Sequence, residues 1–363
     1  MTLRVLCVLG TRPEAIKMAP VIRTLRADPR FDVRVLATAQ HREMLDQVLT
    51  TFGIVPDADL DVMRPGQGLG ALTARLVEGL DAAIAREAPD AVLAQGDTTS
   101  VLATALAAFY RGVPFGHVEA GLRTGDLSAP FPEELNRVLV APMARWHFAP
   151  TEGAAAALLA EGIAPDRVHV TGNTVIDALL QAPAPADPAA AAPFAPRQIL
   201  ATLHRRENFG PPLARILEAI AGLLEEHPDC GVLLPVHPNP AVGPAIRDRL
   251  GGHPRVRLVA PLGYADFVAA MRASYLILTD SGGVQEEAPA LGVPVLVLRE
   301  TTERPEAVAA GVARLVGTRP AAIRAAAGSL LRDPRARARM ITGRSPYGDG
   351  RAAGRIAAIL AAA

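Results

Sequence analysis

Short runs of apolar residues alternate along the chain with longer amphipathic, alanine-rich stretches. The apolar runs are continuous, which is typical of strands that are covered on both faces. Such alternation predicts right-handed βαβ units on parallel sheets. We predict strands at residues 4–9, 32–38, 91–95, 114–119, 147–149 and 168–170, and then at 198–202, 231–235, 256–259, 276–279 and 294–298. Helices are predicted between them, for example at 20–25, 72–86, 99–108 and 213–227.

A proline- and alanine-rich segment at residues 182–197 divides this pattern into two halves of similar size. Its five prolines rule out a continuous helix, so we interpret it as a linker or exposed loop. A chain of 363 residues also exceeds what one hydrophobic core usually serves. The sequence therefore predicts two α/β domains, 1–181 and 198–345, with Rossmann-like, doubly wound parallel sheets that face a cleft.

Charge and composition exclude several classes of partner. The formal net charge is zero, which argues against nucleic acid as a ligand. No apolar run of 18 residues is present, so no membrane span is expected. Cys7 and Cys230 are predicted to be buried thiols in a reducing cytoplasm, and no zinc motif is present. The sequence thus favours a cytoplasmic protein without a metal.

The predicted strands are followed by polar residues and glycines. Because the carboxyl ends of parallel strands lie on the same side of a sheet, these residues should line a ligand site. Carboxylates and imidazole there suggest proton transfer. The candidates for this chemistry are Asp97, Glu119, Glu133 and His204.

Each of these residues also has a purely structural interpretation. Asp97 precedes two threonines and could be a helix N-cap. Glu119 could pair with Arg123, and His204 could pair with Glu207. The turn at Asp280 could be an ordinary connection from strand to helix. We favour function because both halves supply such groups at strand ends.

Further residues suit an anionic ligand. Ser281, Gly282 and Gly283 precede a predicted helix, whose free N–H groups can bind phosphate. A glutamate on that helix could bind a ribose diol. Lys17 is the only lysine among the 37 Lys+Arg residues and follows the first predicted strand. Arg12, Lys17 and Arg304 could neutralise a diphosphate.

Neither a Gly-x-Gly-x-x-Gly after the first strand nor a Walker A motif is present. The sequence therefore disfavours a nicotinamide cofactor and ATP hydrolysis.

Together these motifs closely resemble those of the non-hydrolysing bacterial UDP-N-acetylglucosamine 2-epimerases, from the first strand to residue 350. The segments that carry the resemblance are 10–20, 38–44, 96–99, 117–126, 132–134, 171–177, 204–208, 280–289, 301–306 and 345–350.

The resemblance implies a glycosyltransferase B type of fold, with a C-terminal helix at about 346–363 that crosses back to the first domain. It also implies a homodimer, no cofactor, and reversible conversion of UDP-GlcNAc to UDP-ManNAc for cell-surface polysaccharide. The reaction would eliminate UDP to a 2-acetamidoglucal and then add it back.

The resemblance also assigns roles to residues. The implied catalytic residues are Lys17, Asp97, Glu119, Glu133 and His204. The implied substrate-binding residues are Arg12, Arg123, Arg137, His237, Phe267 on uracil, Ser281, Gly282 and Gly283 on the phosphates, Glu287 on the ribose, and Arg304.

Some members of the family are activated by substrate at a second site, for which Gln40, His41 and Arg42 are the candidate effector residues here. Glu43 and Gly66 depart from the pattern of those members, so we expect weak or absent activation. Two alternatives also remain open at this point: a 2-epimerase of a modified UDP-sugar, such as a 2,3-diacetamido uronic acid, and a UDP-sugar hydrolase or glycosyltransferase.

Overall fold

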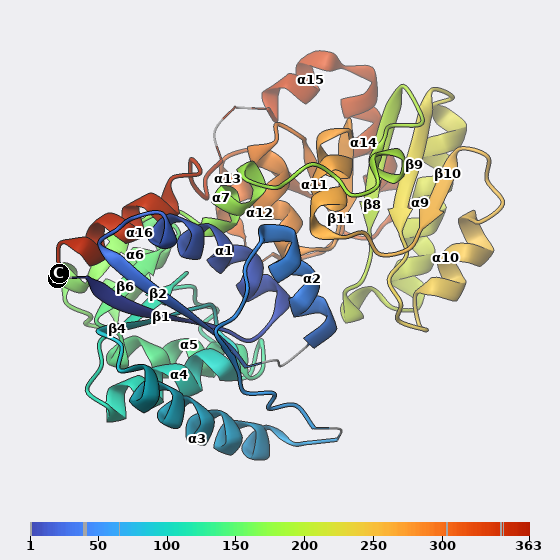
Figure 1. The fold of residues 1–363 in the computed structure, drawn as a ribbon. Coiled ribbons are helices and arrows are strands. Elements are labelled where there is room, and N and C mark those ends of the chain that lie inside the picture. Colours follow the sequence, from blue (N-terminus) through green and yellow to red (C-terminus); the bar gives the residue numbers. More distant parts are fainter. Residues whose placement is uncertain (1, 39–41, 65, 303, 342, 344) are drawn as a thin grey trace. The chain divides into compact units, whose positions relative to one another are not determined.

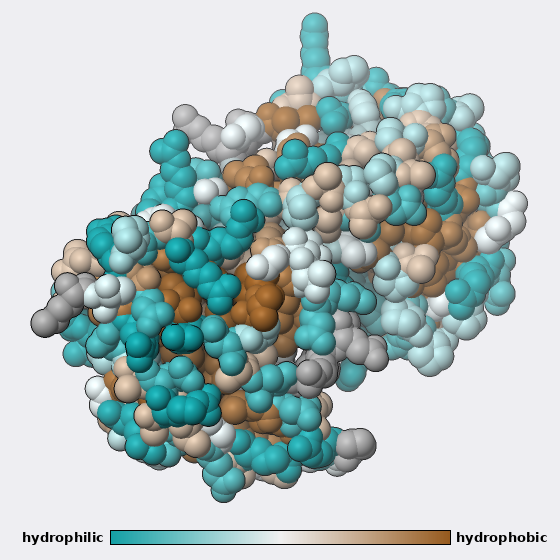
Figure 2. Space-filling model, in the orientation of Figure 1, coloured by the Kyte–Doolittle hydropathy of each residue, from teal (hydrophilic) through white to brown (hydrophobic). Residues whose placement is uncertain are grey.

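Two parallel β-sheets organise the chain in the computed structural model, which describes residues 2–38, 42–64, 66–302, 304–341, 343 and 345–363. Each sheet belongs to a separate unit. Unit 1 comprises residues 1–181 together with 347–363, and unit 2 comprises residues 182–346. On the face shown in Figure 2, hydrophilic residues predominate, and smaller areas of hydrophobic residues show among them.

The sheet of unit 1 has the strand order β3-β2-β1-β4-β5-β6-β7, with every pairing parallel. The strands are β1 (Leu3–Leu9), β2 (Phe31–Ala37), β3 (Ala58–Asp59), β4 (Ala91–Gln95), β5 (Phe115–Val118), β6 (Trp146–Ala149) and β7 (Val168–Val170). The carboxyl ends of β1, β4 and β5 are therefore neighbours, which brings the residues that follow them together.

Helices cover both faces of this sheet (Figure 1). One layer contains α3, α4 and α5, and α1, α7 and α16 pack together in the other. The helices are α1 (Arg12–Arg26), α2 (Arg42–Phe52), α3 (Leu69–Glu87), α4 (Thr99–Tyr110), α5 (Glu133–Val140), α6 (Glu152–Ala160), α7 (Thr174–Leu180) and α16 (Ala352–Ala361). Aliphatic side chains such as Leu6, Leu76 and Leu80 fill the core between α3 and the sheet.

Helix α16 returns to unit 1 from the far end of the chain. The buried carboxylate of Asp177, on α7, accepts hydrogen bonds from the N–H groups of Ala352 (3.1 Å) and Ala353 (2.9 Å). These N–H groups lie in the first turn of α16, where no intrahelical acceptor exists. Asp177 thus caps a helix that begins 175 residues later in the chain.

The sheet of unit 2 has the order β10-β9-β8-β11-β12-β13 and is also parallel throughout. Its strands are β8 (Arg197–Thr202), β9 (Cys230–Pro235), β10 (Val256–Val259), β11 (Leu276–Thr279), β12 (Val295–Val297) and β13 (Ala313–Leu315). Its helices are α8 (Pro188–Ala191), α9 (Pro211–Glu226), α10 (Gly243–Leu250), α11 (Tyr264–Arg272), α12 (Gly282–Ala290), α13 (Pro305–Ala309), α14 (Pro320–Arg332) and α15 (Pro334–Arg339). The ends of β9, β8 and β11 are adjacent here.

The predicted fold class is confirmed, because both sheets are parallel and each predicted strand is present within about a residue or two of its expected bounds. Strands β3 and β13 were not predicted. They have two and three residues and contain no apolar run long enough to stand out. The proline-rich segment contains the short helix α8, which packs against α11 within unit 2.

Candidate functional site

The turn from β1 to α1 is built around a buried carboxylate. Glu14, in the first turn of α1, accepts hydrogen bonds from the backbone N–H groups of Gly10 (2.5 Å) and Thr11 (3.0 Å). Its other oxygen accepts a hydrogen bond from the hydroxyl of Thr98, at 2.6 Å. Since Thr98 follows β4, Glu14 joins the ends of two neighbouring strands.

Lys17 and Glu119 form an ion pair in which both side chains are largely buried. Lys17 lies on α1, and Glu119 follows β5, so the pair joins residues 102 positions apart. The backbone of Glu119 has a φ of +64°, a left-handed conformation that costs free energy for any residue with a β-carbon. The packing around the end of β5 therefore imposes the position of this carboxylate.

Gly121 shows how tight that packing is. Its φ is +90°, and an added β-carbon would lie 2.2 Å from the carbonyl oxygen of Ala154 on α6. Only glycine combines this conformation with so close an approach of two backbones.

Asp97 and Arg137 form another ion pair that follows the strands of unit 1. The Arg137 guanidinium donates to Asp97 Oδ2 from Nε (2.9 Å) and Nη2 (2.6 Å), and to Glu134 at 2.8 Å. The Asn136 side chain donates to the carbonyl of Asp97, at 2.8 Å. Helix α5 thus fixes both the backbone and the carboxylate of Asp97.

We call Lys17, Asp97, Glu119 and Arg137 the unit 1 cluster. Three other predicted residues of this unit lie differently. Arg12 begins α1 and is half-buried. Glu133, which begins α5, is half-buried and has no hydrogen-bond or ion-pair partner among the described residues. The Arg123 guanidinium donates two hydrogen bonds to Glu161, at 2.7 and 2.8 Å. Of the effector candidates, Gln40 and His41 lie outside the described residues, and Arg42 is described only by its backbone, which begins α2.

In unit 2, the fully buried carboxylate of Asp280 organises the end of β11. It accepts hydrogen bonds from the backbone N–H groups of His204 (3.1 Å) and Arg205 (3.0 Å) and from the side chain of Asn208 (3.1 Å). His204 Nδ1 lies 3.0 Å from Asp280 Oδ1, and the His204 ring stacks on the ring of His237 with centroids 5.9 Å apart.

We call His204, His237 and Asp280 the unit 2 cluster. Because Nδ1 of His204 is bonded to Asp280, Nε2 is the nitrogen that remains for a ligand.

Ser281 is the N-cap of α12, and Gly282 and Gly283 form its first turn. An added β-carbon on Gly282 would lie 3.3 Å from an Arg205 guanidinium nitrogen. The first N–H groups of a helix have no intrahelical acceptor, and the helix dipole favours an anion there. This turn, with an arginine beside it, therefore suits a phosphate.

The same helix holds two buried glutamates. Glu286 pairs with Arg304, and Glu287 accepts a hydrogen bond from the Tyr264 hydroxyl at 3.0 Å. Phe267 lies on α11, three residues after Tyr264, and is half-buried. Helices α11 and α12, which carry the predicted residues Phe267 and Glu287, are thus linked by the hydrogen bond between Tyr264 and Glu287.

The surroundings of several of these groups shift their pKa values. Burial raises the pKa of Glu14 to about 7, although the hydrogen bonds from Thr98, Gly10 and Thr11 favour its charged form. Burial also opposes ionisation of Asp280, but the hydrogen bond and charge of His204, together with other donors, hold its pKa below the usual value. Burial lowers the pKa of His237, and the neighbouring His204 lowers it further.

The purely structural interpretations of Asp97, Glu119 and His204 name contacts that differ from those in the structure. Thr98, not Asp97, is the N-cap of α4, with its side chain 3.4 Å from the Val101 nitrogen. Glu119 pairs with Lys17 rather than with Arg123. His204 pairs with Asp280.

Sequence reasoning left several residues of these networks off the candidate list: Glu14, Thr98, Glu134, Arg205, Asn208, Tyr264, Asp280 and Glu286. Asp280 and Glu286 do follow a predicted strand, which is a usable signal. No sequence pattern points to Tyr264, because its role depends on a contact between two helices.

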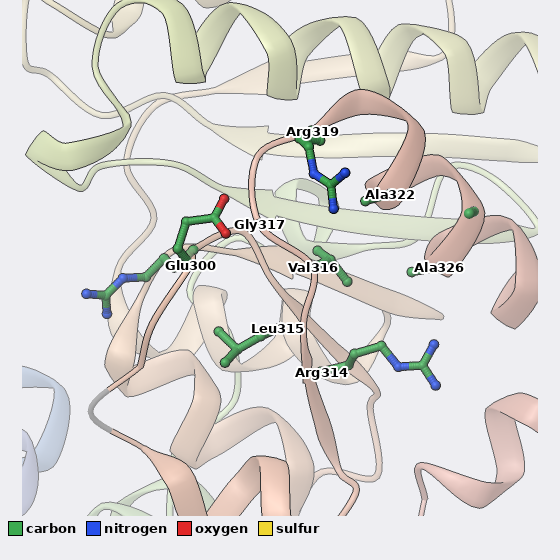
Figure 3. A pocket seen from close by; sticks show the side chains of 10 residues that line it. Glu300, Arg314, Leu315, Val316, Gly317, Arg319, Ala322 and Ala326 are labelled. Carbon is green, nitrogen blue, oxygen red and sulfur yellow. The ribbon is translucent and has the colours of Figure 1, made fainter.

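A cavity of about 540 Å³ lies elsewhere in unit 2, between the end of β12, β13 and α14. Figure 3 shows that Arg314 and Arg319 extend in different directions from its wall. None of the predicted site residues lines it, so it is not part of the candidate site.

The two parallel sheets, of seven and six strands, define a glycosyltransferase B class of fold. A solved structure of the glycotransferase of kitacinnamycin shares this fold, with a TM-score of 0.65 at 16% identity over 99% of this chain and 100% of that one. At such low identity, the match concerns the fold alone.

Closer comparisons identify the family. A family model described as UDP-N-acetylglucosamine 2-epimerase matches residues 23–361. The UDP-N-acetylglucosamine 2-epimerase of Escherichia coli K12 is 52% identical, over 98% of this chain and 97% of its own. That of Bacillus subtilis is 49% identical, over 98% and 94%. The chain belongs to the UDP-N-acetylglucosamine 2-epimerase family, and the family predicted from its motifs is confirmed.

Two solved structures agree with this assignment. The Neisseria meningitidis UDP-GlcNAc 2-epimerase bound to UDP-GlcNAc has a TM-score of 0.89 at 45% identity, over 99% of this chain and 100% of that one. A Staphylococcus aureus protein in a co-structure with UDP has a TM-score of 0.88 at 44% identity, over 98% and 95%. Among the described residues, no helix combines the length and the hydropathy needed to cross a membrane.

Proposed function

We propose that this protein interconverts UDP-GlcNAc and UDP-ManNAc by inverting C2 of the sugar. The observation that carries the proposal is the 52% identity to the Escherichia coli 2-epimerase over nearly the whole chain. The relative from Neisseria meningitidis, solved with UDP-GlcNAc bound, supports the same substrate.

The reaction sets demands that the candidate residues can meet. The proton on C2 is hardly acidic, so a base must remove it while the C1–O bond to UDP breaks or has broken. The products of this step are UDP and a 2-acetamidoglucal. UDP then adds back to C1, and a proton reaches C2 from the opposite face. Two acid/base groups are therefore needed, one on each face of the ring.

In this proposal, the acid/base groups are drawn from Asp97, Glu119, Glu133 and His204. Asp97 and Glu119 are held by the cations Arg137 and Lys17, which support fixed orientations. Glu133 has no competing partner in the described part of the chain, which leaves its carboxylate able to exchange a proton.

Unit 2 binds the UDP part in the same proposal. Ser281, Gly282 and Gly283 offer backbone N–H groups to the phosphates, with help from Arg304. Glu287 takes the ribose and Phe267 packs on the uracil. Arg12, Lys17, Arg123, Arg137 and His237 complete the substrate contacts, and cations near the diphosphate stabilise the charge that develops as UDP leaves.

The protein is also proposed to act as a homodimer. Support comes from apolar side chains exposed in unit 1, on helices α4 and α5 that pack together: Phe109, Tyr110, Leu135 and Leu139. A dimer would cover such residues. Light scattering of the purified protein measures the state directly, and a monomeric mass would contradict it.

We further propose that the reaction takes place in the cytoplasm and supplies ManNAc units for cell-surface polysaccharide. The buried free thiols of Cys7 and Cys230 suit a reducing compartment.

The test is incubation of the protein with UDP-GlcNAc in deuterated water, followed by NMR and chromatography. Deuterium at C2 in a mixture of UDP-GlcNAc and UDP-ManNAc is expected. Failure to exchange deuterium would refute the proposal, free sugar would indicate a hydrolase, and exchange only with a 2,3-diacetamido sugar would identify a modified substrate. Asp97→Asn, Glu119→Gln and Glu133→Gln should each lower turnover while UDP still binds; if all three variants stay fully active, these residues are not catalytic.

A further inference from the structure

Glu14 is a buried carboxylate for which no basic side chain lies within ion-pair distance among the described residues. Its side chain belongs to the first turn of α1, and the residue is 3% exposed. A charge removed from water in this way is destabilising unless hydrogen bonds replace its hydration. The burial of a carboxylate at this position therefore needs a specific structural explanation.

The two hydrogen bonds to one of the carboxylate oxygens of Glu14 have a local explanation. The bonds from the N–H groups of Gly10 and Thr11 satisfy donors at the start of α1, as in a capping box. A capping glutamate needs only these contacts and is usually found at the surface.

The other oxygen reaches a distant segment. Thr98, which donates to it at 2.6 Å, lies 84 residues away at the N-cap of α4. The carboxylate also occupies the space beside Gly10, where a β-carbon would lie 2.9 Å from Glu14 Oε2 and 2.6 Å from the hydroxyl of Ser100. Gly10, Glu14 and Thr98 thus form a tightly packed link between the turns after β1 and β4.

These two turns contain the groups assigned above to the reaction. The turn after β1 leads into Arg12 and Lys17, and Asp97 directly precedes Thr98. The link is also independent of ionisation. A charged Glu14 accepts from the Thr98 hydroxyl, and a protonated Glu14 can donate to the same oxygen. Since burial raises the pKa of Glu14 to about 7, both forms are present near neutral pH.

We propose that Glu14 is a positioning residue for the epimerase reaction, which holds Asp97 at a fixed separation from Arg12 and Lys17 by tying Thr98 to the start of α1. The inference rests on the proposed function, because it concerns the same reacting groups. Loss of the link should misplace Asp97 while the UDP-binding residues of unit 2 stay intact.

The experiment compares four single variants. Glu14→Met removes both halves of the link at similar side-chain length, and Thr98→Val removes only the long-range half. Glu14→Gln and Thr98→Ser are the matched controls, because an amide or a serine hydroxyl can remake the bond. We expect kcat to fall by about 10- to 100-fold in the first two variants, since small displacements of reacting groups have effects of this size. The Kd for UDP should change by less than about twofold, because the residues assigned to its uracil, its ribose and the phosphate-binding turn lie in unit 2.

The two controls should retain kcat near the wild-type value. The double variant Glu14→Met/Thr98→Val should be no slower than the slower single variant, because both changes break one link. Two results would overturn the positioning role. One is a folded Glu14→Met variant with the wild-type kcat. The other is a Glu14→Gln variant with a lowered kcat, which would mean that the charge of Glu14 is required rather than its hydrogen bond. An inactive wild-type protein would instead refute the proposed function, and the positioning role with it.

Discussion

His147 makes unit 1 sensitive to acid. The residue lies on β6 with no exposed surface, and neither ring nitrogen has a hydrogen-bond partner among the described residues. Its register partner on β5 is His117, whose Nε2 donates to the carbonyl of Gly96 at 2.7 Å. Burial lowers the pKa of both histidines to about 4, and for His147 the adjacent His117 contributes next.

The direction of the pH effect follows from these values. An unfolded histidine has a pKa near 6.5, so on acidification the unfolded chain takes up the proton first. The stability contributed by neutral His147 is therefore present above about pH 6.5 and is lost as the pH falls toward 4. Between pH 7 and pH 5, this single residue should lower the free energy of unfolding by about 2 kcal/mol. For a unit of this size, that corresponds to a melting temperature lower by about 4 to 8 °C.

The chain offers a direct reporter, because its single tryptophan, Trp146, is adjacent to His147 on β6 and is buried. Urea unfolding followed by Trp146 fluorescence at pH 7, 6 and 5 should be measured for the wild type and for His147→Gln, which does not titrate in this range. The variant should lose about 2 kcal/mol less stability between pH 7 and pH 5. Other titrating groups contribute equally to both proteins and cancel.

A smaller effect is expected for His169→Gln, because His169 is only half-buried, although burial lowers its pKa too. Parallel stability curves for the wild type and His147→Gln would refute the reasoning, since they would mean that His147 binds protons equally in the folded and unfolded chains.

Three other predictions concern single contacts. Gly121→Ala should destabilise unit 1 by about 3 kcal/mol or more in urea unfolding. Gly125→Ala, which is also at positive φ but in open space, should lower the stability by only about 1 kcal/mol, and equal losses for the two variants would contradict the steric argument. Lys17→Arg should lower turnover at least about tenfold in a steady-state assay, because a planar guanidinium cannot replace the compact ammonium beside Glu119, and normal turnover would make the lone lysine an accident of composition. Asp177→Ala should weaken the docking of α16 by about 1 to 2 kcal/mol, visible as faster hydrogen exchange in that helix, and unchanged exchange would argue against the cap.

The sequence predicts the parts of the fold that depend on local pattern. Apolar runs such as residues 91–95 and 276–279 coincide with β4 and β11, because a strand buried on both faces has no polar positions. Helix α1 is harder to delimit. It begins at Arg12, but Pro20 in its interior is a residue that usually interrupts a helix, so the pattern indicates only its second half.

The partners within the site depend on contacts between distant segments, which no local pattern encodes. Glu119 is a sequence candidate because it follows a strand, but its pairing with Lys17 depends on how α1 packs against the sheet of unit 1. Likewise, the pairing of His204 with Asp280 follows from the adjacency of β8 and β11 in the sheet order. Strand order is a property of the tertiary fold. The sequence therefore predicts which residue types can carry the chemistry, whereas the hydrogen-bond and ion-pair partners of these residues are known only from the structure.

The return of residues 347–363 to unit 1 has a consequence for synthesis on the ribosome. Unit 2 is continuous in sequence, so its sheet can form as soon as residues 182–346 have emerged. Unit 1 begins to emerge first, yet the carboxylate of Asp177 waits for Ala352 and Ala353 until all of unit 2 has been translated. The unit that contains most of the candidate acid/base groups is therefore the last to be completed, and chains stalled before residue 352 would expose the surface of α1 and α7 that α16 covers.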